Sequence, residues 1–129
     1  MHVDGGARGN PGPAAVAAVA TDESGGELAE RNAYIGETTN NVAEYKAVLL
    51  ALELAVELGA NEVEVINDSE LIARQIGGEY KVKQAHLKPL HAEAMAALRG
   101  FDRWAVRTVR REHNVRADEL VNEALDAET

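Results

Sequence analysis

The feature that most constrains this 129-residue chain is the order of its strand-like and helix-like segments. Three strand-like stretches come first, a long helical segment follows, and strands then alternate with helices. The expected strands cover residues 1–5, 14–21, 27–35, 62–67 and 104–110, and the expected helices cover residues 40–58, 69–76, 87–99 and 115–127. Hairpins followed by strand–helix units predict an α/β fold with a mixed sheet and helices on its faces.

The helix over residues 40–58 is the clearest of these segments. Thr39 or Asn40 is placed to cap it, Gly59 is placed to end it, and no proline interrupts it. At about 100° per residue, one carboxylate, Glu44, falls near the middle of the apolar side. An unpaired buried carboxylate costs several kcal/mol, so Glu44 there needs a cation, a proton or strong donors. If the helix is turned slightly, Glu44 is instead an ordinary surface acid at the edge.

Three further acids lie at positions where ligands often bind. Asp68 follows the strand at 62–67, Asp4 closes the first strand before a glycine-rich loop, and Asp118 falls in the first turn of the last helix. The ends of strands in open α/β sheets are common ligand sites. Each acid also has an ordinary explanation: Asp68 as a helix cap, Asp4 as part of an Asp-Gly turn, and Asp118 as a complement to the helix dipole.

Composition narrows the chemistry that such acids can perform. The chain has no cysteine, which excludes disulfides, thiolate zinc sites and a cysteine nucleophile. Oxygen ligands favour Mg²⁺ or Mn²⁺ over Zn²⁺, and crowded acids need cations or raised pKa values. Two cations about 4 Å apart would activate water and stabilise the leaving oxygen of a phosphodiester. If the fold gathers the four acids, they indicate a nuclease.

Length and hydropathy predict one domain over residues 1–129. Hydrophobic residues make up 46% of the chain, enough for a core, and no apolar run approaches the roughly 20 residues that span a bilayer. The expectation is a cytoplasmic, monomeric protein without a membrane partner.

The net charge of −9 argues at first against a nucleic-acid partner, but the charge is unevenly distributed. Residues 74–116 contain ten basic and four acidic residues, whereas the segments on either side are strongly acidic. This middle segment is either a solvated charged surface or a track for a phosphate backbone.

Four short motifs, taken in order, resemble those of type 1 ribonuclease H. They are residues 4–13 (DGGARGNPGP), 38–44 (TTNNVAE), 67–69 (NDS) and 116–120 (RADEL), and their order and spacing extend over nearly the whole chain. The resemblance implies a five-stranded mixed sheet, with three antiparallel strands followed by parallel strand–helix units, flanked by helices. It also implies an endoribonuclease that cuts the RNA strand of RNA/DNA hybrids and leaves 5′-phosphate and 3′-hydroxyl ends.

The resemblance assigns roles to particular residues. Four acids would hold two Mg²⁺ ions, with Mn²⁺ as a substitute: Asp4, Glu44, Asp68 and Asp118. Residues that would contact the hybrid are Arg8, Asn10, Thr39, Asn40 and Asn41. Amides and hydroxyls suit sugars, phosphates and base edges without reading a sequence, although the polar run at 38–41 is also explained by helix capping.

The chain departs from many relatives in three ways. It lacks a long basic protrusion and has only Lys81 and Lys83 there. The loop before the last acid is short, so His113 lies five residues before Asp118, either as an aid to proton transfer or product release or as an ordinary exposed histidine. Glu70 stands where many relatives have Gln. We expect a basic rim for the hybrid formed by Lys81, Lys83, Arg107, Arg110, Arg111 and Arg116.

Three other functions compete with hybrid cleavage. A silent hybrid-binding module is disfavoured because all four acids are present. An exonuclease of the same fold usually opens with Asp-x-Glu, but position 6 here is glycine. A nucleotide-binding loop is disfavoured because residues 5–12 lack the spacing of either common phosphate-binding motif.

Overall fold

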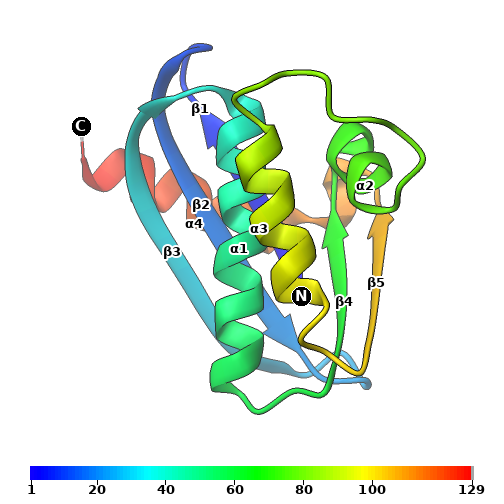
Figure 1. Cartoon of the computed structure of the whole chain (residues 1–129). Coiled ribbons are helices and arrows are strands. Elements are labelled where there is room, and N and C mark those ends of the chain that lie inside the picture. The colour runs from blue at the N-terminus through cyan, green and yellow to red at the C-terminus, as the bar shows by residue number, and fades with distance from the viewer. Residues whose placement is uncertain (129) are drawn as a thin grey trace.

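The structure is a computed structural model that describes residues 1–128 (Figure 1). Its strands are β1 (His2–Ala7), β2 (Gly12–Thr21), β3 (Glu27–Thr38), β4 (Glu62–Asn67) and β5 (Arg103–Thr108). Its helices are α1 (Asn40–Glu57), α2 (Glu70–Ile76), α3 (Lys88–Leu98) and α4 (Val115–Ala127), with a short 3₁₀ helix, η1, at Arg111–His113. None of the helices in residues 1–128 has both the length and the apolar character needed to cross a bilayer.

The five strands form one mixed sheet in the order β3-β2-β1-β4-β5. The β1–β2 and β2–β3 pairs are antiparallel, whereas β1–β4 and β4–β5 are parallel. The predicted fold class and element order are therefore confirmed. Because β1 lies in the middle of the sheet, it brings the antiparallel and parallel halves together at one place.

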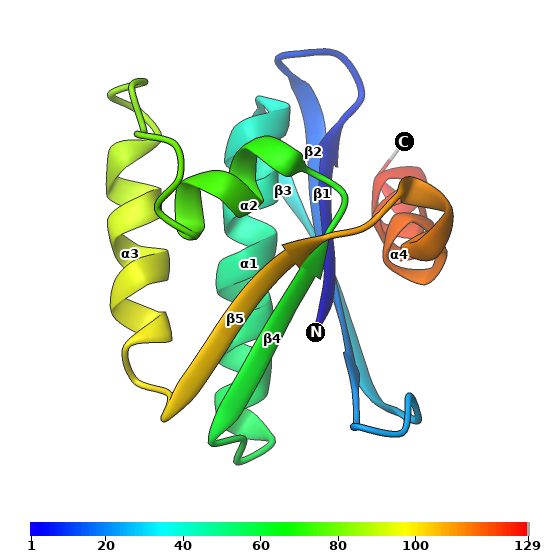
Figure 2. The same cartoon turned by 90° about the vertical axis from the view of Figure 1, so that its right-hand side faces the viewer.

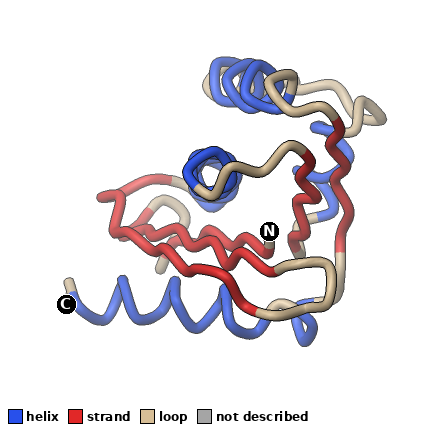
Figure 3. The backbone as a smooth tube through the Cα atoms, turned by 90° about the horizontal axis from the view of Figure 1, so that it is seen from below, coloured by secondary structure: helices blue, strands red, loops and turns tan. Residues whose placement is uncertain are grey.

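The helices cover the two faces of the sheet unequally. α1 lies directly on one face with α2 and α3 beside it, and α4 lies alone on the other (Figures 2 and 3). The larger core cluster lies on the α1 side and includes Tyr45, Leu52 and Val65. A smaller cluster, with Leu120 and Val121, packs α4 against β2. Functional side chains on β1 and α1 are thus held by well-packed elements.

The main difference from the sequence prediction concerns β1. We expected it to end at Gly5, but pairing with β2 continues to Ala7, which lies opposite Ala14. Gly5 and Gly6 weaken the local preference for a strand, but pairing with the long strand β2 outweighs this weakness. Asp4 therefore lies inside a strand and not at its end as expected, and the alternative of an Asp-Gly turn does not hold.

Gly5 allows α1 to approach the sheet closely. A Cβ at this position would overlap the carbonyl oxygen of Ala43 on α1. A side chain here would push α1 off the sheet, so glycine is required for the observed packing. Because Glu44 follows Ala43, the close approach also brings Glu44 near Asp4.

Candidate active site

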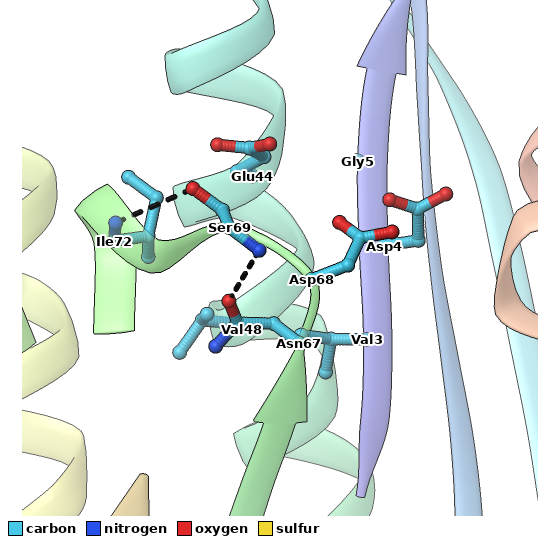
Figure 4. Close-up of a pocket in the computed structure, with 9 residues that line it drawn as sticks. All are labelled: Val3, Asp4, Gly5, Glu44, Val48, Asn67, Asp68, Ser69 and Ile72. Atoms are coloured by element: carbon cyan, nitrogen blue, oxygen red, sulfur yellow. Dashed lines mark hydrogen bonds between the residues drawn. The ribbon is translucent and has the colours of Figure 1, made fainter. Parts of the chain in front are cut away.

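Three of the predicted acids line one small cavity between β1, α1 and the end of β4 (Figure 4). Asp4 comes from the middle of β1, Glu44 from α1, and Asp68 from the residue after β4. The cavity has a volume of about 10 Å³, and Asn67 and Ser69 also line it. That volume is close to the space that one water molecule needs.

The fourth acid, Asp118, reaches the same place from the opposite face of the sheet. It lies in the first turn of α4, and its carboxylate can accept a hydrogen bond from the protonated Asp4 carboxyl, which raises the pKa of Asp4. The fold therefore brings together four acids that are separated by up to 114 positions in the sequence. No sequence-local motif dictates this arrangement, which depends on the sheet order.

Burial and crowding change the ionisation of Asp4 most. Burial raises the pKa of Asp4 to about 8, and the negative charges of Asp68, Asp118 and Glu44 add to the effect. A carboxyl in this position therefore holds its proton near neutral pH unless a cation is present.

Glu44 follows the same rule with a smaller shift. Burial raises its pKa to about 7, while a hydrogen bond from the Ser69 side chain lowers it in part. Glu44 is half-buried, whereas Lys46 and Glu53 on the same helix are exposed. The helix is therefore oriented as the sequence predicted, and Glu44 is not an ordinary surface acid.

Neighbouring groups partly oppose the effect of burial on the pKa of Asp68. Burial raises its pKa, and the Arg111 guanidinium, with Nε 3.9 Å from Asp68 Oδ2, works in the opposite direction. The amide of Asn114 also hydrogen-bonds Asp68 and lowers its pKa. Asp68 is not the cap of α2, because that cap is Ser69, whose Oγ accepts from Ile72 N at 3.3 Å.

The donor set fits a divalent cation chemically. All four groups are carboxylates, and oxygen donors of this kind suit Mg²⁺ and Mn²⁺. Within residues 1–128, no three Asp, Glu or His side chains are already gathered in the geometry of a metal site. Mutual repulsion between the carboxylates opposes such gathering, and a divalent cation would remove this repulsion.

Several residues predicted to contact substrate also make hydrogen bonds within the protein, near the start of α1. Asn40 Oδ1 accepts from Ala7 N at 2.8 Å, and Asn40 N donates to Asn10 Oδ1 at 3.1 Å. Thr39 caps α1 by accepting from Val42 N at 3.3 Å. Asn41 is half-buried in the first turn of α1. These bonds fix the mouth of the site between β1 and α1.

Arg8 and His113 lie further from the acids. Arg8 Nη2 pairs with Asp126 at 2.7 Å and also donates to Asn122 at 3.2 Å, so it joins the β1–β2 loop to α4. His113 is exposed on η1, with Nε2 3.9 Å from Glu112 Oε1. Neither side chain lines the cavity.

The structure disperses the expected basic rim. Lys81 and Lys83 are exposed on the connection between α2 and α3, and Arg111 faces Asp68. Arg107 pairs with Glu64 at 3.1 Å. Arg116 does not join the rim, because it binds three acids that lie away from the cavity: Glu30, Glu119 and Glu123.

Sequence reasoning missed two polar residues that shape the site. Ser69 both caps α2 and bonds Glu44, and Asn114 is buried with its amide on Asp68. Their positions in the sequence could have indicated them, because Ser69 follows Asp68 and Asn114 lies four residues before Asp118.

Comparison with known sequences agrees with this geometry. A family model described as reverse transcriptase-like matches residues 2–124. Ribonuclease HI of Halobacterium salinarum is 44% identical over 97% of this chain, and a bifunctional protein of Mycobacterium tuberculosis is 44% identical over 98%. The matched regions make up 63% and 35% of those relatives, so the chain spans less than two thirds of each.

Solved structures give the same result at higher coverage. The RNase H1 of Halobacterium salinarum superposes with a TM-score of 0.95 at 44% identity, covering 98% of this chain and 96% of that one. LC11-RNase H1, solved in complex with an RNA/DNA hybrid, gives a TM-score of 0.93 at 50% identity, covering 98% and 96%. The N-terminal RNase H domain of a Mycobacterium tuberculosis protein gives 0.93 at 44% identity, covering 97% and 91%. The chain therefore belongs to the type 1 ribonuclease H family.

Proposed function

We propose that this protein is an endoribonuclease that hydrolyses the RNA strand of RNA/DNA hybrids. The observation that carries the proposal is the convergence of Asp4, Glu44, Asp68 and Asp118 from four separate elements, with raised pKa values at the first three. Strongly shifted carboxyls at a cavity are typical of a functional site. Similarity to an RNase H1 solved with an RNA/DNA hybrid supports the same class of substrate.

The four acids would hold two Mg²⁺ ions, for which Mn²⁺ can substitute. When bound, these ions would activate a water for in-line attack on the scissile phosphate and stabilise the departing 3′ oxygen, leaving 5′-phosphate and 3′-hydroxyl ends. The protein's own part is to hold the carboxylates on rigid elements: Asp4 on the central strand, Glu44 on α1 and Asp118 on α4. Ser69 and Asn114 lie beside Glu44 and Asp68 and lower the pKa of these two carboxyls, as partners of metal-binding residues do.

Recognition would use backbone and sugar contacts. Asn10, Asn40 and Asn41 lie at or near the mouth of the site and suit the minor groove, and Thr39 suits a phosphate of the DNA strand. The 2′-hydroxyl would identify the strand to be cut. Arg8 extends the same surface, and His113 would assist proton transfer or product release.

Three wider expectations belong to the same proposal. Residues 1–129 would form a single catalytic domain that acts as a monomer in the cytoplasm. The absence of cysteine suits a reducing compartment but does not require one.

The proposal is tested with end-labelled RNA/DNA, RNA/RNA and DNA/DNA duplexes, incubated with Mg²⁺ or with EDTA. We expect internal cuts in the RNA of the hybrid only, abolished by EDTA. A ladder that grows from one end would indicate an exonuclease, and metal-dependent hybrid binding without cleavage would indicate a silent binding module.

A further inference from the structure

Asn114 is buried next to the acids, although sequence reasoning gave it no role. It lies between η1 and α4, and only 2% of the residue is exposed. Its Nδ2 donates to the carbonyl oxygen of Val3 at 2.8 Å. Because Val3 precedes Asp4, this bond fixes the segment of β1 that carries the most perturbed carboxyl.

The same residue contacts two other acid-bearing segments. Its backbone carbonyl accepts from Asp118 N at 3.2 Å, within the first turn of α4. Its side-chain amide also lies close enough to the Asp68 carboxylate to lower the pKa of Asp68. One residue therefore contacts β1, the end of β4 and the start of α4.

The energetics of this amide indicate that its nitrogen matters most. Asn114 Oδ1 is buried and has no hydrogen-bond partner among the described residues. Burying a polar atom without a partner is destabilising, and an apolar side chain would avoid this penalty. The bond from Nδ2 to Val3 and the nearness of the amide to Asp68 explain why an amide occupies this position.

We propose that Asn114 is a positioning residue that sets the relative placement of Asp4, Asp68 and Asp118. This inference rests on the proposed function, because its purpose is to align carboxylates that hold metal. Asn114 acts through these acids and is not itself a catalytic residue. Second-sphere partners of this kind tune metal affinity as well as rate.

The test compares Asn114→Ala and Asn114→Ser with Leu125→Ala. Leu125 is a buried residue of α4 that packs on the sheet, so its truncation loosens the helix without touching an acid. Three quantities are measured for each: Mn²⁺ affinity by calorimetry without hybrid, kcat and KM for hybrid at saturating Mg²⁺, and the melting temperature.

We expect Asn114→Ala to weaken Mn²⁺ affinity and to lower kcat by about 10- to 100-fold, with KM within about twofold. Asn114→Ser keeps a shorter donor and should fall between this variant and the wild type. Leu125→Ala should lower the melting temperature and leave Mn²⁺ affinity and kcat within about twofold of wild type.

Two results would overturn the inference: wild-type Mn²⁺ affinity and kcat in Asn114→Ala, or equal losses in Leu125→Ala. If Asn114→Ala does not fold, the same comparison between Asn114→Ser and Leu125→Ala decides. A wild-type protein that neither binds Mn²⁺ nor cuts hybrid would overturn the proposed function itself, which separates the two failures.

Discussion

Two charged regions of the molecule differ in how the fold arranges them. Four acids from β1, α1, the end of β4 and α4 are far apart in sequence and meet in one partly buried place. The ten basic residues of 74–116 are close in sequence, yet they lie on α2, α3, β5, η1, α4 and the connections between them. Arg74, Arg103 and Arg107 pair with neighbouring acids.

The difference shows that charged residues clustered along the sequence need not cluster in the fold, and that distant ones can meet. Each additional buried carboxylate costs free energy in its charged form, so the pKa values of Asp4, Glu44 and Asp68 are raised. Exposed arginines pair in water at little cost or gain. A test of this comparison should find large effects at the acids and small ones at the basic residues.

The largest expected effect comes from Asp68→Asn. The change removes one carboxylate oxygen from the cluster but keeps nearly the same shape. Losing several kcal/mol of transition-state stabilisation corresponds to about a 1,000-fold drop in kcat. Single-turnover cleavage of labelled hybrid measures the rate, and circular dichroism checks the fold. Unchanged turnover in a folded variant would remove Asp68 from the site.

The second effect is on stability without metal, measured by urea unfolding in EDTA. The pKa of Asp4 is about 8 in the folded protein, against about 4 for an unfolded aspartate. Between these values the folded state keeps a proton that the unfolded state releases, so wild-type stability falls as pH rises from 4 to 8. Asp4→Asn should reduce this slope and be more stable than wild type by about 1–3 kcal/mol at pH 8.

An acid outside the cluster provides the matched control for that experiment. Asp22 is exposed in the β2–β3 turn, and a hydrogen bond from Ser24 lowers its pKa. Asp22 therefore contributes stability at neutral pH that is lost as pH falls through its folded pKa. Asp22→Asn should destabilise at neutral pH, opposite to Asp4→Asn. The same sign for both variants would contradict the proposed cause.

A third prediction distinguishes two neighbouring arginines. Arg111 lies 3.9 Å from Asp68, whereas Arg110, equally exposed, lies 4.0 Å from Glu112. Because the Arg111 charge lowers the pKa of Asp68, Arg111→Gln should move the acidic limb of kcat/KM to higher pH. It should also raise KM by about 3- to 10-fold if the charge meets the hybrid. Arg110→Gln should leave the limb in place, and identical profiles would contradict a local role for Arg111.

Much of the fold followed from the sequence, for local reasons. The apolar spacing and caps of α1 and the Asp68-Ser69 start of α2 are signals that a short window contains. The extension of β1 through Gly5 and Gly6 is not such a signal, because β2 imposes it across the sheet. Strand ends are least predictable where the partner strand decides them.

The candidate site was predictable in its residue types and less so in its contacts. The four acids stood out because Glu44 falls on the apolar side of a helix and the other three were expected at the ends of elements. The roles of Ser69 and Asn114 depend on neighbours far away in sequence, as with Asn114 and Val3. The directions of Arg111 and Arg116 depend on the turn at η1 and on the face of α4, which charge counting does not reveal.

The smallest expected effect is that of Arg116→Gln, which tests whether the basic residues of 74–116 act apart from the hybrid surface. Arg116 bonds Glu30 of β3 at 2.9 Å and Glu119 of its own helix at 3.1 Å. An exposed network gives modest stability, so we expect the melting temperature to fall by only about a few degrees. KM for hybrid should stay within about twofold, because this charge is already neutralised by acids. A rise in KM as large as that of Arg111→Gln would place Arg116 on the hybrid and restore the continuous basic rim that the sequence predicted.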